Sequence, residues 1–117
     1  MATVIRTVLV HRDGTERAGL RAALEALPGV EVAGERPDLR SGIALARQSR
    51  PDILLLELAH PVEETLAAAA QFRLDQPDCA IFVVSENHDP DTLLRAMRAG
   101  ASEVLRRPLD RATLSVA

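Results

Sequence analysis

The stretch Asp52-Ile53-Leu54-Leu55-Leu56-Glu57 decides the fold of this chain. Four consecutive aliphatic residues lie between two carboxylates, and the run is too short for a free-standing buried helix. Because the run does not alternate between polar and apolar residues, it predicts a strand covered on both faces, as in the middle of a parallel sheet. Open α/β sheets bind ligands beyond the carboxyl ends of their strands. Glu57 is at that end and is the first candidate site residue.

The segments on either side repeat a strand and helix alternation. Strands are predicted in four further runs rich in aliphatic and β-branched residues: 4–10, 30–33, 79–84 and 102–105. Helical spacing and strong helix formers predict helices over 16–27, 39–50, 62–75 and 90–99, with Asp110 as the cap of a final helix. This order predicts a doubly wound α/β fold, a five-stranded parallel sheet with helices on both faces.

Details of the helices follow from residue type and spacing. Asp13 or Thr15 is predicted to cap the first helix, whose Arg17 and Arg21 are expected on its outer side, and Asp38 is predicted to cap the second. In the 90–99 helix four side chains are predicted to face inward: Leu93, Leu94, Ala96 and Met97.

Composition limits the classes of function. The 117 residues, 47% of them hydrophobic, fit one domain with an ordinary core. The formal net charge of -3 disfavours binding to nucleic acid. Cys79 is the only cysteine, which excludes an intrachain disulfide and favours a reducing, cytoplasmic setting. No signal peptide and no membrane-spanning run of about 20 apolar residues is recognisable, so membrane insertion is not expected.

Polar residues follow four of the predicted strands and are expected to converge on one crevice. They are His11, Arg12 and Asp13; Glu57; Ser85 and Glu86; and Arg106 and Arg107. The three histidines of the chain lack the i, i+4 spacing of a helical metal site, and Ser85 lies outside any Gly-x-Ser-x-Gly elbow. We therefore predict no catalytic residue, no metal site, no cofactor and no enzymatic activity.

Five separated segments resemble the receiver domain of two-component response regulators in order and distance. They are 10–14 with 17–20, 50–57, 83–85, 98–101 and 105–108. The resemblance covers essentially the whole chain and implies one receiver-like domain over residues 1–117. It also implies the flavodoxin-like (CheY-like) strand order 2-1-3-4-5 and a connection to phosphorelay signal transduction.

The sequence departs from this family at its phosphorylation site. Receivers accept a phosphoryl group on an aspartate, bind Mg²⁺ through an acidic pair, and use a hydroxyl, a lysine and an aromatic switch residue. Carried over position by position, the phosphoacceptor falls on Glu57, the acidic pair on His11 and Arg12, the hydroxyl on Ser85, the lysine on Arg107 and the aromatic residue on Val104. Only Ser85 is a usual residue for its position.

Charge counting predicts how such a site behaves. With His11 mostly neutral near pH 7, two arginines face one glutamate, so Mg²⁺ should not bind. Our hypothesis is that Glu57 is held by Arg12, Arg107 or both, which would leave the domain in one state. Two alternatives stay open. Either the site has decayed and its charged groups are solvated, or the arginines, His11 and Ser85 form a pocket for a small anion.

The segment 98–109, joined to this centre, resembles the atypical receiver domains at the N-terminus of TadZ/CpaE pilus assembly proteins. That resemblance implies a phosphorylation-independent interaction and localisation module in Tad/Flp pilus assembly, working through protein partners. It also implies a longer polypeptide with a C-terminal ATPase or other output domain. The alternatives are a conventional phosphorelay receiver controlling an output domain and a sensor of small anionic ligands.

Receivers commonly signal through the fourth helix, fifth strand and fifth helix. In this chain the corresponding face carries interleaved charges, which suit a two-fold homodimer: Asp91, Arg95, Arg98, Glu103, Arg106 and Arg111. A merely solvated charged face is the alternative interpretation.

Overall fold

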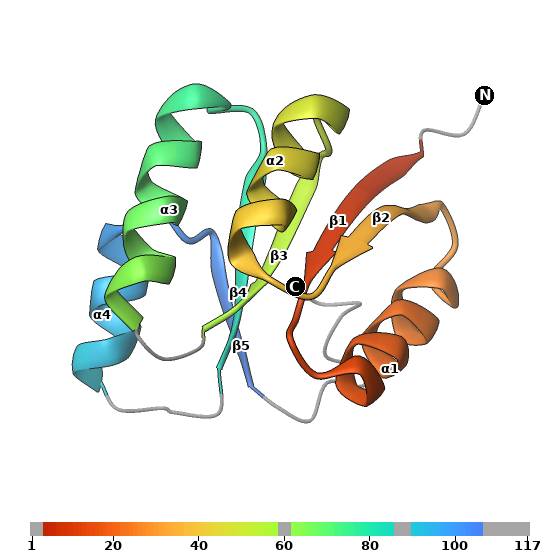
Figure 1. The fold of residues 1–117 in the computed structure, drawn as a ribbon, viewed down its shortest axis with the longest axis horizontal. Coiled ribbons are helices and arrows are strands. Elements are labelled where there is room, and N and C mark those ends of the chain that lie inside the picture. Colours follow the sequence, from red (N-terminus) through yellow and green to blue (C-terminus); the bar gives the residue numbers. More distant parts are fainter. Residues whose placement is uncertain (1–3, 59–61, 86–89, 107–117) are drawn as a thin grey trace.

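The fold is known from a computed structural model that describes residues 4–58, 62–85 and 90–106 (Figure 1). Five strands form one parallel sheet in the order β2-β1-β3-β4-β5. Their bounds are β1 (Ile5–Val10), β2 (Val30–Arg36), β3 (Ile53–Glu57), β4 (Ala80–Ser85) and β5 (Glu103–Arg106). The helices of the described residues are α1 (Gly14–Glu25), α2 (Leu39–Ser49), α3 (Val62–Asp75) and α4 (Pro90–Arg98). The predicted fold class and strand order are confirmed.

The central strand β3 is covered on both faces, as its aliphatic run predicts. Leu54 and Leu56 are buried in a cluster with residues of α2 and α3, such as Ile43 and Phe72. Leu55 points to the opposite face and packs in a second cluster that contains Leu20 of α1. Successive side chains of a strand point to opposite faces, so a strand buried on both faces must be apolar at every position.

Aspartate side chains cap the first turns of α1 and α2. Asp13 caps α1, because its Oδ1 accepts a hydrogen bond from the Glu16 backbone N–H at 2.9 Å. Asp38 caps α2, as predicted, and accepts from both the backbone N–H and the hydroxyl of Ser41. Both hydrogen bonds lower the pKa of Asp38 below its ordinary value, and the one from the Ser41 backbone has the larger effect.

Strand β2 is longer than its sequence pattern predicts. The pattern supports a strand over 30–33, whereas β2 continues through Gly34 and Glu35 to Arg36. The extension follows from pairing with β1, which aligns Val10 with Arg36 after a register shift between Thr7 and Val8. The segment 34–36 is therefore ordered by its neighbour, and it carries Glu35 to the carboxyl end of the sheet.

Cys79 is buried, and burial raises the pKa of its thiol to about 11, so the thiol stays protonated near neutral pH. Among the described segments, no helix has the length and apolar character needed to cross a membrane. The final helix predicted from Asp110 lies outside the described residues.

Candidate functional site

Glu57 ends β3 and meets the turn that follows β1. Its carboxylate accepts a hydrogen bond at Oε1 from the Arg12 backbone N–H, at 3.1 Å. Its Oε2 lies 3.5 Å from Arg12 Nε and 3.7 Å from His11 Nε2. The Glu57 side chain is only 13% exposed. The fold thus brings together three of the predicted site residues, because β1 and β3 are adjacent in the sheet.

His11 is fully buried beneath Glu57, directly after β1. Its backbone N–H donates to the Arg36 carbonyl at 3.2 Å, and its Nδ1 accepts from the Asp13 backbone N–H at 3.2 Å. A ring nitrogen that accepts an N–H carries no proton, so in this geometry the imidazole proton resides on Nε2, the nitrogen that faces Glu57. At 3.7 Å from Glu57 Oε2, this nitrogen lies beyond hydrogen-bond distance of the carboxylate.

Arg12 contributes two different groups to the carboxylate. Its guanidinium is on a side chain that is 64% exposed, where solvent screens the ion pair to roughly 0–1 kcal/mol. Its backbone N–H is held in place by the turn, and a hydrogen bond from an amide to a charged acceptor contributes about 1.5–3 kcal/mol. The position of the Glu57 side chain consequently depends more on the Arg12 backbone than on its charge.

The other predicted positions lie further along the sheet. Ser85 ends β4, is buried, and is aligned with Arg106 of β5. Val104 of β5 is half-buried against the core cluster on the α2 and α3 face. Arg107 lies outside the described residues, so its pairing with Glu57 stays a prediction. Asp13, the acid nearest the expected acidic pair, is engaged in capping α1.

The donor set at Glu57 does not fit Mg²⁺. That ion requires near-octahedral oxygen ligands, usually with one or two carboxylates and several waters. At this site the described residues supply one carboxylate, a histidine whose Nδ1 is already hydrogen-bonded, and a guanidinium 3.5 Å from the carboxylate. Across residues 4–58, 62–85 and 90–106, no three His, Cys, Asp or Glu side chains gather in a metal-binding group.

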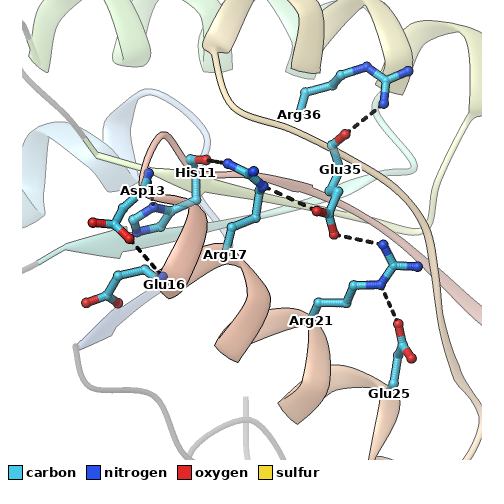
Figure 2. A network of polar contacts seen from close by, with 8 residues as sticks. All are labelled: His11, Asp13, Glu16, Arg17, Arg21, Glu25, Glu35 and Arg36. Carbon is cyan, nitrogen blue, oxygen red and sulfur yellow. Dashed lines mark hydrogen bonds and ion pairs between the residues drawn. The ribbon is translucent and has the colours of Figure 1, made fainter.

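A charged network behind the site was missed by sequence reasoning. Arg17 was expected on the outer side of α1, but its side chain is 20% exposed and its Nη1 donates to the His11 carbonyl at 2.8 Å. Figure 2 shows Arg17 and Arg21 reaching from α1 to Glu35 on β2. The i, i+4 spacing of the two arginines was a signal for a shared partner. The partner itself could not be found, because the sequence pattern ended β2 before Glu35.

The predicted interaction face is partly described. Asp91, Arg98 and Glu103 are exposed, while Arg95 Nη2 donates to Glu63 of α3 at 2.9 Å. Arg106 belongs to β5, and Arg111 lies outside the described residues.

The inward prediction for two α4 residues is wrong. Leu94 is 48% and Met97 50% exposed, and the buried residues of α4 are Thr92 and Ala96. The face of α4 that carries Thr92 and Ala96 points toward the core, and this rotation of the helix leaves Leu94 and Met97 on the surface.

Sequence comparisons with known proteins agree with the fold described above. The family model for the response regulator receiver domain matches residues 8–117. The transcriptional regulatory protein LiaR of Bacillus subtilis (strain 168) is 33% identical over 102 residues, which cover 87% of this chain and 48% of LiaR. This chain thus spans about half the length of that relative.

Solved structures are similar over nearly the whole chain. The signal receiver domain of the response regulator NarL from Mycobacterium tuberculosis has a TM-score of 0.88 at 24% identity, covering 96% of this chain and 90% of that one. A pilus assembly protein, cpaE, from Burkholderia thailandensis has a TM-score of 0.83 at 25% identity, covering 97% of this chain and 93% of that one.

Proposed function

This chain belongs to the response regulator receiver domain family, and on that premise we propose that it is a pseudo-receiver, a protein interaction module that works without phosphorylation. The observation that carries the proposal is that the Arg12 backbone N–H donates to the Glu57 carboxylate while the Arg12 guanidinium forms an ion pair with it. The Arg12 guanidinium and backbone N–H thus contact the carboxylate at the position where relatives would bind metal and phosphate.

The chemistry of phosphoryl transfer supports this interpretation. Metal ions clamp the phosphoryl oxygens and neutralise the charge that develops on them during transfer. A site whose one carboxylate is paired with a guanidinium does not attract a divalent cation and so lacks both effects. Glu57 in this role is a charged group that holds the turn after β1 to the end of β3. The domain then stays in one conformation and presents a constant surface to its partners.

The biological setting we propose is pilus assembly in the cytoplasm. The likeness to the cpaE structure supports it, as does the resemblance of residues 98–109 to the TadZ/CpaE group. The domain would bind protein partners and localise them, attached to an ATPase or other output domain. The second candidate function is a conventional phosphorelay receiver that controls an output domain. The 33% sequence identity with LiaR, a transcriptional regulatory protein, supports it.

A titration separates these functions. We expect backbone NMR spectra to show no saturable shift at Glu57 or Ser85 when Mg²⁺ and beryllium fluoride are added, because the site lacks the ligands for both. Incubation with acetyl phosphate and Mg²⁺ should leave no acyl phosphate detectable by mass spectrometry. Saturable shifts at Glu57 with Mg²⁺ would establish the conventional receiver instead. Shifts at Arg12 and Ser85 with inorganic phosphate alone would point to an anion sensor.

We further propose that the chain forms a homodimer through α4 and β5. The exposed Leu94 and Met97 supply apolar area beside the charges of Arg98 and Glu103. In a two-fold interface, a cation of one copy can meet an anion of the other.

Charge reversal tests the dimer. Arg98→Glu is expected to weaken dimerisation by at least about tenfold, because it places like charges in contact. Sedimentation velocity over a concentration series measures the change. The matched control is Arg40→Glu, the same reversal at an exposed residue of α2, which should leave the mass distribution unchanged. An Arg98→Glu chain that sediments like the natural one would refute this face.

A further inference from the structure

The peptide unit between His11 and Arg12 is held at both ends by charged side chains. Its carbonyl oxygen, from His11, accepts a hydrogen bond from Arg17 Nη1 at 2.8 Å. Its N–H, from Arg12, donates to Glu57 Oε1 at 3.1 Å. Because a trans peptide is planar and its C=O and N–H point in opposite directions, the guanidinium and the carboxylate lie at opposite ends of one dipole. Each charge faces the end of the peptide that attracts it.

Such an arrangement strengthens both hydrogen bonds. A cation at the carbonyl oxygen polarises the peptide and makes its N–H a better donor, and a carboxylate at the N–H acts in the same direction. The effect is larger where water is excluded, and Glu57 and Arg17 are 13% and 20% exposed. The charge of Arg17 therefore strengthens the hydrogen bond between the Arg12 N–H and Glu57 by polarising the peptide, although no direct contact joins the Arg17 and Glu57 side chains.

Arg17 is itself fixed by a second layer of charges (Figure 2). Its Nε lies 3.3 Å from Glu35 Oε1, and Glu35 Oε2 lies 2.9 Å from Arg21 Nη1. Arg21 also donates through Nε to Glu25 at 2.6 Å. The hydrogen bonds to Glu25 and Glu35 raise the pKa of Arg21, and the bond to Glu25 has the larger effect. Glu35 thus orients the Arg17 guanidinium so that another of its donors points at the His11 carbonyl.

We propose that Arg17 is a positioning residue for the Glu57 site and acts through the peptide between His11 and Arg12. The inference rests on the proposed function, since it explains how this chain holds the Glu57 carboxylate without metal. It assigns the exposed edge formed by α1 and β2 a part in maintaining the site, through Glu35 and Arg17.

Amide hydrogen exchange of the 117-residue chain, followed by NMR, tests the proposal. In Arg17→Gln, the Arg12 amide is expected to exchange roughly tenfold faster, because its hydrogen bond to Glu57 loses the support of the cation. The matched control is Arg47→Gln, which removes the same charge from an arginine of α2 whose partner, Asp75, lies outside this network. It should alter Arg12 exchange less than twofold to threefold, by rough estimate. Thermal unfolding of each variant reports global stability separately.

Two further variants keep the outcome decisive. Arg17→Lys retains the charge with fewer donors and should restore part of the protection of the Arg12 amide. Equal exchange of this amide in Arg17→Gln and the natural chain would overturn the role of Arg17. Glu57→Gln should itself accelerate the exchange, because it removes the charged acceptor. If Glu57→Gln has no effect, the carboxylate is not held as proposed, and the proposed function fails rather than the inference about Arg17 alone.

Discussion

Replacing His11, Arg12 and Glu57 together by aspartate is expected to raise the affinity for Mg²⁺ by on the order of 100-fold or more. The formal charge of the three side chains changes from zero, with one arginine, one glutamate and a neutral histidine, to -3. At about 4 Å, two unit charges interact with roughly 1 kcal/mol even at the dielectric constant of water, and a divalent cation doubles that value. The substitutions also supply the oxygen ligands that Mg²⁺ requires.

The thermal midpoint at increasing Mg²⁺ concentration measures this gain, since a ligand that binds only the native state raises it. The triple variant should show a Mg²⁺-dependent rise that the natural chain does not show. The matched control is Glu57→Asp alone, which restores the usual acceptor and keeps Arg12 and His11. If this single variant gains as much as the triple variant, Arg12 and His11 are not what prevents Mg²⁺ from binding.

Gly42→Ala is expected to destabilise the fold by about 2 kcal/mol. Gly42 lies in α2 against β1, and a Cβ at this position would overlap Val10 Cγ2 and lie 3.2 Å from Val10 Cβ. Val10 is buried in the core cluster and cannot move aside without disturbing its neighbours. Because the overlap with Val10 is severe, the cost of overpacking is expected at about 3 kcal/mol, and the gain of about 1 kcal/mol from replacing glycine by alanine in a helix leaves a net loss of about 2 kcal/mol.

Chemical denaturation gives the free energy of unfolding for this variant and its control. The control is Gly19→Ala in the interior of α1, where a Cβ would meet no atom of the described residues within 4 Å apart from its chain neighbours and the backbone of its own helix. This variant should gain about 0.5–1 kcal/mol, so the two identical substitutions are expected to have opposite signs. Adding Val10→Ala to Gly42→Ala should make the Gly42 substitution less costly, as a double-mutant cycle measures. Equal effects at both glycines would contradict the close approach of α2 to β1.

Much of the fold was predictable because its signals are local. The apolar run of β3 predicts burial on both faces, and Leu54, Leu55 and Leu56 are all buried. The Asp38 cap was predictable because a carboxylate before a helix has backbone N–H groups within reach. The meeting of His11 and Arg12 with Glu57 followed from the order of the strands, because residues after adjacent parallel strands lie at one edge of the sheet. The roles assigned to these residues stay predictions.

By itself, then, the sequence determined the strand and helix order and the parallel sheet. That His11 and Arg12 stand where relatives carry acidic residues stays a prediction from the resemblance. Only the tertiary structure decided that β2 reaches Glu35, that Arg17 turns inward to the His11 carbonyl, and that Met97 faces outward. The physical reason is that these features depend on which element packs beside another and at what rotation. Spacing along one segment specifies a periodic pattern, whereas contacts between segments select the partner of each side chain.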